Sequence, residues 1–261
     1  MKTPIKYYGG KQKLVPYILP RIPKHQLYGE PFTGGAAVFF AKQASNVEVL
    51  NDTNKELMNF YRVVQNDFVS LEKEVRITLH SRDLHRKAQV INAHPDLFNE
   101  VKRAWAVWVL SSQSFSAQLD GSWGYDKSEN RTSKLIQARK ERFTEELAIR
   151  LQNVQIEATD ARYIIRSRDS QKSFFYCDPP YYNSDCGHYD GYTEEDYVGL
   201  LTDLAAIKGK FLLSSYPSVP LLAAVKQHGW HLWSLEQKVT VNAKSGYLKR
   251  KVEVLASNYP I

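Results

Sequence analysis

The residues with the clearest capacity for chemistry are Asp178, Pro179, Pro180 and Tyr181, which follow one another directly. The apolar, aromatic run 173–176 before them has the composition of a buried strand. The two prolines should end that strand, because neither has an N–H group to donate to a sheet. The sequence therefore predicts a carboxylate, a rigid backbone and a ring at the carboxyl end of a strand, where open α/β sheets bind ligands. An ordinary turn with exposed rings is the alternative.

A second stretch with capacity for binding runs from Glu30 through Phe32, Thr33 and Gly34 to Gly35. It lies between a predicted strand and an apolar helix, so its glycines would let backbone N–H groups and a helix N-terminus approach a ligand closely. The chain contains neither Gly-x-x-x-x-Gly-Lys-Ser/Thr nor Gly-x-Gly-x-x-Gly, so a phosphate loop is not indicated. The small residues and the acid suit a nucleoside with a cationic arm better than a pyrophosphate.

Two further segments could complete a nucleoside site. Tyr7 and Lys11 flank a Gly-Gly turn and would offer a ring and a cation. Asp52 ends a predicted strand about twenty residues beyond the glycines, where α/β nucleotide sites place a carboxylate on the ribose hydroxyls. Asp52 could instead cap the helix that we expect from Asn54 to Val64.

In order and spacing, these motifs resemble those of the Dam-like DNA adenine methyltransferases: Tyr7-x-Gly-Gly-Lys11, Glu30-Pro31-Phe32-x-Gly-Gly35 and Asp178-Pro-Pro-Tyr181. The resemblance extends from residue 6 to the last predicted strand, Lys251–Tyr259. It implies an α/β, Rossmann-like fold that depends on S-adenosylmethionine. It also implies transfer of a methyl group from S-adenosylmethionine to the exocyclic amino nitrogen of an adenine flipped out of duplex DNA.

The resemblance assigns roles to individual residues. Asp178 and the Pro179 carbonyl would accept hydrogen bonds from the amino group, and Tyr181 would stack on the base. The expected catalytic residues are Asp178, Pro179, Pro180 and Tyr181. The residues expected to hold S-adenosylmethionine are Tyr7, Lys11, Phe32, Thr33, Gly34, Gly35, Asp52, Asp160 and Asp178. Asp160, at the end of a predicted strand from Val154, could equally cap the segment 161–166.

The middle of the chain differs in character from both ends. Helical periodicity is present in 56–64, 67–79, 97–110 and 136–151. We therefore predict a discontinuous catalytic domain, residues 1–55 and 146–261, with a helical target-recognition insertion at residues 56–145. A charge run is usually a solvated helix face, but the resembled family places its recognition part here.

Candidate DNA contacts lie mainly in a polar loop with embedded rings, 111–127, and just beyond it. Ser, Gln and Lys side chains suit phosphates and base edges, and rings suit unpaired bases. An ordinary surface loop is the alternative. The candidates are Arg86, Gln113, Ser114, Trp123, Tyr125, Lys127, Arg131 and Lys134. A basic hairpin, 239–251, could also touch phosphate, or could serve as a charged edge against aggregation.

Composition agrees with a soluble DNA-binding enzyme. The 261 residues carry a net charge of +7, which attracts polyanions, although many basic proteins bind none. Cys177 and Cys186 lack metal-ligand spacing, so we expect free thiols, no metal and a reducing cytoplasm in a bacterial, archaeal or phage-infected cell. No apolar run suits a membrane span, and no signal peptide is evident. We expect double-stranded DNA as partner, no obligate protein partner, and a monomer or weak dimer.

Two alternatives remain at this point. The same motif class serves RNA adenine and protein amide methylation, although the basic helical segment favours a nucleic acid. A catalytically dead DNA-binding protein of the same fold is the second alternative, against which Asp178, Tyr181 and the intact Gly-rich loop argue.

Overall fold

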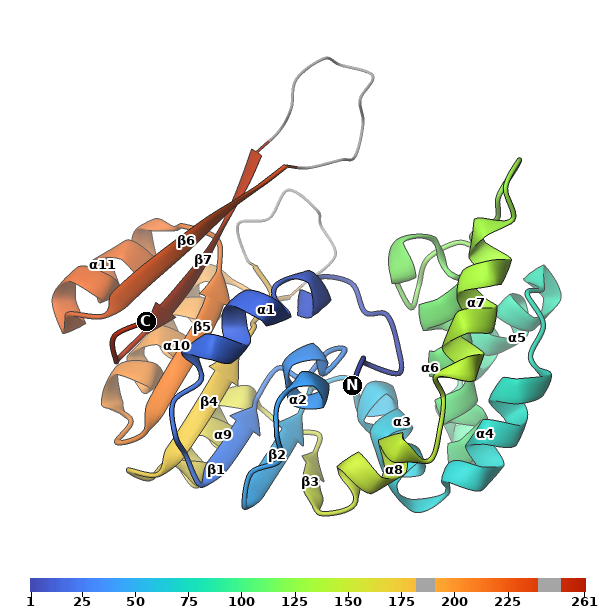
Figure 1. The fold of residues 1–261 in the computed structure, drawn as a ribbon, viewed down its shortest axis with the longest axis horizontal. Coiled ribbons are helices and arrows are strands. Elements are labelled where there is room, and N and C mark those ends of the chain that lie inside the picture. Colours follow the sequence, from blue (N-terminus) through green and yellow to red (C-terminus); the bar gives the residue numbers. More distant parts are fainter. Residues whose placement is uncertain (182–190, 239–249) are drawn as a thin grey trace. The chain divides into compact units, whose positions relative to one another are not determined.

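The computed structural model describes residues 1–181, 191–238 and 250–261, and it has a mixed α/β fold (Figure 1). Among these residues, seven strands form one sheet in the order β3-β2-β1-β4-β5-β7-β6. The strands are β1 (Leu27–Glu30), β2 (Val47–Asn51), β3 (Val154–Glu157), β4 (Ser173–Cys177), β5 (Lys210–Ser215), β6 (His231–Lys238) and β7 (Arg250–Ser257). The predicted α/β class is confirmed.

Helices occur between most strands. The helices are η1 (Lys11–Lys13), α1 (Val15–Ile18), η2 (Leu19–Arg21), α2 (Ala37–Ala41), α3 (Lys55–Asn66), α4 (Phe68–Ile77), α5 (Arg82–Ala93), η3 (Pro95–Leu97), α6 (Glu100–Gln113), η4 (Phe115–Ala117), α7 (Arg131–Glu141), α8 (Glu146–Leu151), α9 (Ala161–Arg168), α10 (Glu194–Ala206) and α11 (Val219–His228). None of them, within the described ranges, is both long and apolar enough to cross a membrane.

The chain divides into two compact units. The first unit contains Met1–Pro20 and Thr33–Thr159, and the second contains Arg21–Phe32 and Asp160–Ile261. In the first unit, β2 pairs parallel with β3. In the second unit, β1, β4 and β5 are parallel, while β7 pairs antiparallel with β5 and β6.

In the first unit, α6 is the central helix. Its residues from Ala104 to Gln113 are all buried, and α3, α4 and α5 pack around it (Figure 1). A helix that is apolar all round requires such a covering, because no face of it tolerates water. Asn54 caps α3 by accepting hydrogen bonds from two backbone N–H groups, which fixes where the helix after β2 begins.

In the second unit, β4 is the most buried of the strands whose burial is described throughout, since every residue from Ser173 to Cys177 is buried. Parallel strands covered on both faces have such continuous apolar runs. Phe175 and Leu213 belong to the surrounding core, which α10 covers. The helix α10 begins with a cap at Thr193, which the Asp196 side chain completes as a capping box.

Several expectations about the helical segment need refinement. The helix predicted over 136–151 is two helices, α7 and α8, because the chain turns at Phe143 to bury that ring against Phe68 at 5.3 Å between centroids. The helix α5 was not predicted. Residues 56–145 contain helices and no named strand, but the compact units divide the chain elsewhere. A separate recognition insertion therefore stays a prediction. The predicted basic hairpin, 239–251, lies outside the described residues over 239–249.

Candidate active site

The Gly-rich turn in the first unit is tied to the end of β2 by Thr33. The Thr33 N–H donates to the Asn51 carbonyl at 2.8 Å, and the Asn51 N–H donates to Thr33 Oγ1 at 2.8 Å. Gly34 and Ala36 both have positive φ, 46° and 52°, so the chain reverses sharply before α2. The Thr33 hydroxyl therefore holds the loop in place.

The carbonyl groups of the same turn are held by side chains from elsewhere in the first unit. Tyr61 donates its hydroxyl to the Gly34 carbonyl at 2.8 Å, and the Thr3 hydroxyl donates to the Gly35 carbonyl. Tyr7 packs directly on the turn, since a methyl group built on Gly34 would lie 3.2 Å from Tyr7 Cδ1. The predicted residues Tyr7, Gly34 and Gly35 are thus brought together.

Asp52 follows β2 and faces this turn. Its Oδ2 accepts from the Gly34 N–H and its Oδ1 from the Asn54 N–H, each at 3.0 Å. Burial raises the pKa of the carboxyl despite these hydrogen bonds. The helix cap is Asn54, so the alternative role of Asp52 as the cap of α3 is not observed. The carboxylate instead links the strand end to the Gly-rich turn.

Lys11 is buried beside its own turn. The Lys11 ammonium donates to the Gly9 carbonyl at 3.1 Å, and the Gly10 N–H donates to the Tyr7 carbonyl at 3.0 Å. A methyl group on Gly10 would lie 2.9 Å from the Tyr7 carbonyl oxygen, so this position requires glycine. The Tyr7–Lys11 segment is therefore a rigid turn that presents one ring and one cation.

In the second unit, Asp178 and Tyr181 lie immediately after β4. Pro179 is buried, whereas Asp178, Pro180 and Tyr181 are half-buried. The Tyr181 hydroxyl lies 2.5 Å from Glu253 Oε1 and 3.3 Å from Asp178 Oδ1. Burial, with the nearby charges of Asp178 and Glu253, holds the pKa of the Tyr181 hydroxyl well above its ordinary value, so it is protonated at neutral pH.

The Tyr181 ring is also held by its neighbours. It meets the Tyr216 ring edge-on, with centroids 4.4 Å apart and planes at 64°. Ser214 donates to Glu253 Oε1 at 3.3 Å. Sequence reasoning missed Glu253, although an acid within the apolar strand that ends the chain was a visible signal.

The other predicted cofactor residues have different surroundings. Phe32 lies in the second unit and packs edge-on against Tyr192, with centroids 6.4 Å apart. Asp160 is exposed and caps α9 by accepting from the Tyr163 N–H at 2.9 Å, which is the alternative role given above. Glu30 is buried and accepts the Tyr28 hydroxyl at 2.5 Å.

Two predicted DNA contacts, Trp123 and Tyr125, form a stack at the surface of the first unit. Their centroids lie 5.5 Å apart with planes at 17°, and Tyr125 is 55% exposed. The Arg82 guanidinium lies 4.9 Å from the Trp123 centroid, and the His80 ring lies 4.8 Å from it. Stacked rings beside a cation are suited to nucleic acid.

The predicted contacts Gln113 and Ser114 have a different location. Gln113 is fully buried, with Oε1 accepting from Ser81 N–H at 3.2 Å and Nε2 donating to the Leu79 carbonyl at 2.8 Å. Ser114 is buried and hydrogen-bonded to His85 Nε2 at 2.8 Å. Both side chains hold the base of the 115–130 loop and do not face solvent.

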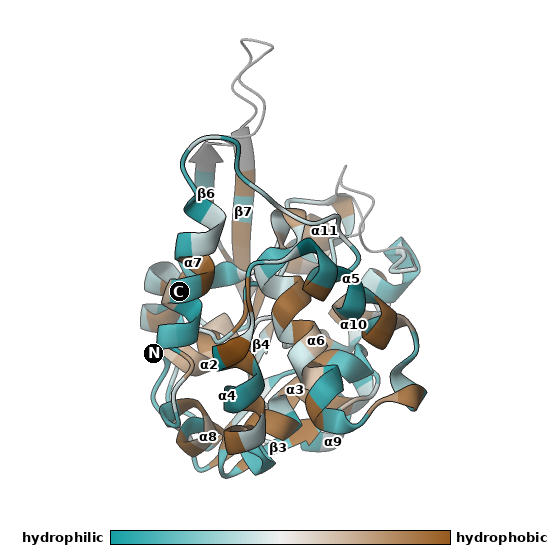
Figure 2. Cartoon of the chain, turned by 90° about the vertical axis from the view of Figure 1, so that its right-hand side faces the viewer, coloured by the Kyte–Doolittle hydropathy of each residue, from teal (hydrophilic) through white to brown (hydrophobic). Residues whose placement is uncertain are grey.

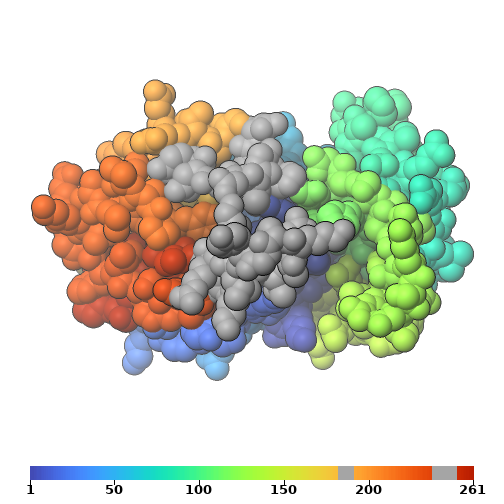
Figure 3. Space-filling view, turned by 90° about the horizontal axis from the view of Figure 1, so that it is seen from above, coloured from blue at the N-terminus to red at the C-terminus, as the bar shows by residue number. Residues whose placement is uncertain are grey.

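The charged candidates are at the surface. Lys127, Arg131, Lys134 and Arg86 are all exposed, and Arg131 forms an ion pair with Glu129. In Figure 3 the turquoise segment that contains α5 and the green segment of 115–141 lie next to each other at the surface. Both segments thus carry exposed basic side chains, and Arg82 of α5 lies beside the aromatic stack.

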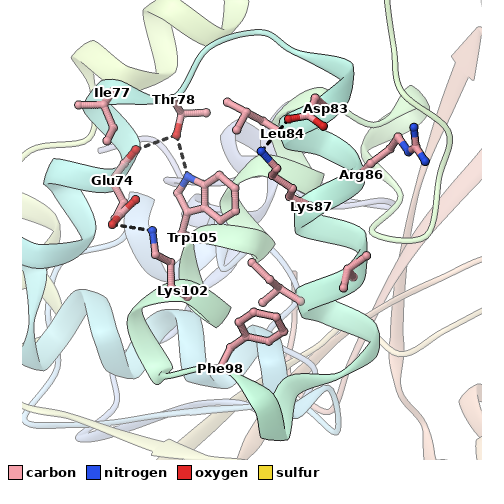
Figure 4. Close-up of a pocket in the computed structure, with 12 residues that line it drawn as sticks. Glu74, Ile77, Thr78, Asp83, Leu84, Arg86, Lys87, Phe98, Lys102 and Trp105 are labelled. Atoms are coloured by element: carbon pink, nitrogen blue, oxygen red, sulfur yellow. Dashed lines mark hydrogen bonds and ion pairs between the residues drawn. The ribbon is translucent and has the colours of Figure 1, made fainter.

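Arg86 also borders a pocket of about 680 Å³ between α4, α5 and α6 (Figure 4). Trp105 forms its floor and donates its indole N–H to Thr78 Oγ1 at 2.7 Å. Lys102 pairs with Glu74 at 2.8 Å across the same wall. Most polar side chains that line the pocket are hydrogen-bonded or ion-paired to one another. The surface that they leave to the pocket is therefore mainly apolar.

Metal-ligand clusters are not found in the part of the chain that the structure describes: no three His, Cys, Asp or Glu side chains converge there.

Comparison with known proteins assigns the family. The model of the D12 class N6 adenine-specific DNA methyltransferases matches residues 7–198. The chain is 27% identical to the type II methyltransferase M1.LlaDCHI of Lactococcus lactis subsp. cremoris, covering 97% of this chain and 94% of that protein. It is 25% identical to M.MjaIII of Methanocaldococcus jannaschii, covering 99% of each, and 22% identical to the retron Ec67 DNA adenine methylase of Escherichia coli, covering 98% and 91%. The predicted resemblance is confirmed, and the use of S-adenosylmethionine follows from it. This chain belongs to the D12 class of N6 adenine-specific DNA methyltransferases.

Proposed function

We propose that Asp178, Pro179 and Tyr181 hold the amino group and ring of the target adenine during methyl transfer. The observation that carries this proposal is the position of the Asp178 carboxylate. It follows a strand whose residues are all buried, is half-buried itself, and has the fixed Tyr181 hydroxyl 3.3 Å away. A carboxylate fixed at the end of a buried strand is preorganised to accept hydrogen bonds from an amine. Pro180 keeps the backbone rigid between them.

The acceptor nitrogen is a weak nucleophile, because its lone pair is delocalised into the adenine ring. Two acceptors, the Asp178 carboxylate and the Pro179 carbonyl, would draw the two N–H bonds toward them and favour tetrahedral geometry at nitrogen. The neutral amine is far too weak an acid for Asp178 to deprotonate it first, so its proton leaves with or after the transfer. A paired base cannot present its amino nitrogen in line, so the adenine must leave the helix.

S-adenosylmethionine, when bound, supplies an electrophilic methyl group on a sulfonium centre. The residues of the Gly-rich turn suit such a molecule. The two hydrogen bonds that Asp52 accepts leave further lone-pair positions on its carboxylate, which suit the two hydroxyls of a ribose. Tyr7 and the turn of Gly34 and Gly35 offer a flat surface, and Lys11 offers a cation to a carboxylate group. We assign Phe32, Thr33 and Asp160 supporting roles, since the contacts described above for these residues are within the fold.

DNA binding is assigned to the helical segment 56–145. The exposed ring of Tyr125, stacked on Trp123 beside Arg82, supports a contact with bases. Arg86, Lys127, Arg131 and Lys134 suit phosphates, which position a duplex without reading its sequence. The buried Gln113 and Ser114 are reassigned to holding the loop that carries the stack.

We propose further that the enzyme needs no metal and acts as a monomer or weak dimer in the cytoplasm of a bacterial or archaeal cell or of a phage-infected cell. Methyl transfer from a sulfonium to an amine requires no Lewis acid, and modifying one base at a time requires no second subunit. The relatives named above come from two bacteria and an archaeon.

A tritium-labelled methyl donor tests the substrate class. Duplex DNA, RNA and a mixture of proteins are offered separately, and label is then located by nuclease digestion and mass spectrometry. We expect label in DNA as N6-methyladenine. Label confined to RNA or protein would contradict the assignment, and absence of label with bound DNA would favour a catalytically dead protein.

A further inference from the structure

Glu253 is a carboxylate in an apolar strand. It lies in the middle of β7, is only 8% exposed, and is followed by the buried Val254, Leu255 and Ala256. Figure 2 shows β7 in largely hydrophobic colouring. Burying a carboxylate is costly unless it accepts hydrogen bonds. An acid at this position therefore needs specific partners.

The partners of Glu253 connect it with the Asp-Pro-Pro-Tyr segment. The Tyr181 hydroxyl lies 2.5 Å from Glu253 Oε1, and Ser214 on the adjacent strand β5 donates to the same oxygen at 3.3 Å. The pairing of β5 with β7 brings these strands together, with Ser214 opposite Leu255. All of these residues belong to the second unit.

The Tyr181 hydroxyl has one hydrogen but two carboxylates within reach. It lies 2.5 Å from Glu253 and 3.3 Å from Asp178. The hydroxyl keeps its hydrogen at neutral pH, because burial raises its pKa. A short contact to an ionised acceptor is much the stronger of the two, so the hydrogen is directed to Glu253 and away from Asp178.

We propose that Glu253 is a positioning residue for methyl transfer: it takes the Tyr181 hydroxyl hydrogen, which fixes the Tyr181 ring and keeps that hydrogen off Asp178. The proposal rests on the role assigned above to Asp178 as the acceptor for the target amine. Without the Glu253 charge, Asp178 becomes the nearest ionised acceptor for the Tyr181 hydroxyl. The hydroxyl then competes with the target amine for Asp178.

Glu253→Gln tests this, because glutamine keeps the size of the side chain and removes the charge. We expect kcat on duplex DNA to fall about 10- to 100-fold, the range of a hydrogen bond to a charged group. The KM values for DNA and methyl donor should change less than about twofold, because Glu253 is assigned no contact with either. The matched control is Glu236→Gln, which removes an exposed carboxylate from the adjacent strand β6, opposite Val252, and should keep the wild-type kcat.

A double-mutant cycle with Tyr181→Phe separates positioning from a general structural effect. Removing the hydroxyl lowers activity by itself but also removes the group through which Glu253 acts. Glu253→Gln should therefore cost less than about twofold in the Tyr181→Phe background. The same loss in both backgrounds, or wild-type kcat in Glu253→Gln, would overturn the inference. A loss explained by unfolding would appear as a lowered Tm and a reduced amount of DNA-binding protein.

Failure of the proposed active site is recognised separately. If wild-type protein does not methylate DNA, or Asp178→Ala still does, the site assignment itself is wrong. If wild type is active, Asp178→Ala is inactive and Glu253→Gln equals wild type, only the role of Glu253 is wrong.

Discussion

Replacing Gly34 with alanine tests how the Gly-rich turn holds the methyl donor. Gly34 has a φ of 46°, and its N–H and carbonyl are both committed, to Asp52 and to Tyr61. A methyl group at this position would lie 3.2 Å from Tyr7 Cδ1 and 3.5 Å from Cε1. The substitution therefore strains the backbone and pushes the Tyr7 ring off the turn.

The magnitude has two parts. An alanine in the left-handed region costs about 1 kcal/mol relative to glycine. Displacing a packed ring adds about 1 to 3 kcal/mol. Gly229 provides the matched control, because its φ is 65° and a methyl group there meets no atom within 4 Å. Gly229→Ala should thus lose about 1 kcal/mol of stability, and Gly34→Ala about 2 to 4 kcal/mol.

Urea denaturation and calorimetric titration with S-adenosylmethionine measure both effects. Gly34→Ala should weaken donor binding about tenfold or more, equivalent to about 1.4 kcal/mol, whereas Gly229→Ala should bind as wild type does. Equal stability losses in the two variants, together with unchanged donor affinity in Gly34→Ala, would refute the packing of Tyr7 on the turn and its part in the donor site.

Two further predictions concern donor and DNA. Burial raises the pKa of Asp52 above its ordinary value, so this carboxylate takes up a proton at a higher pH than an exposed aspartate does. Donor affinity should therefore weaken as the pH falls through the raised pKa. The contribution of Asp52 to folding stability should rise over the same fall in pH, because the folded state binds the proton more tightly than the unfolded state. Titration calorimetry across pH should find weaker, pH-insensitive donor binding for Asp52→Asn, and equal pH dependence in both proteins would contradict this. Trp123→Ala should weaken DNA binding by about 1 to 3 kcal/mol, measured by fluorescence anisotropy, and should leave donor affinity intact. The control is Leu97→Ala, which truncates an exposed apolar side chain between α5 and α6 and should leave DNA binding unchanged.

Local patterns were sufficient to predict the ends of strands. The run before Asp178 is apolar and the prolines after it stop a sheet, so both the strand β4 and the acid at its end could be predicted. Asp52 was equally visible as an acid after β2. Which of Asp52 and Asn54 caps α3 could not be decided from sequence, since both residue types are good caps.

Residues whose partners are distant in sequence were less accessible. Gln113 resembles a loop residue because three polar residues precede Ser114, yet α6 continues through them and its amide pairs with the backbone of Leu79 and Ser81. Burial of a polar side chain depends on such partners, which no periodicity reveals. Glu253 and Tyr181 are likewise connected only through the antiparallel pairing of the last strand.

The central claim is that Asp178 acts in methyl transfer and not in holding DNA. The most direct measurement compares wild type with Asp178→Ala in single-turnover methylation of a duplex. In a parallel sample, fluorescent 2-aminopurine replaces the target adenine and reports flipping of the base. We predict that Asp178→Ala binds the duplex, gives the fluorescence rise of a flipped base, and transfers no measurable methyl group. Methylation within about tenfold of the wild-type rate in Asp178→Ala, a loss well below that expected for removal of an essential acceptor, would contradict the account.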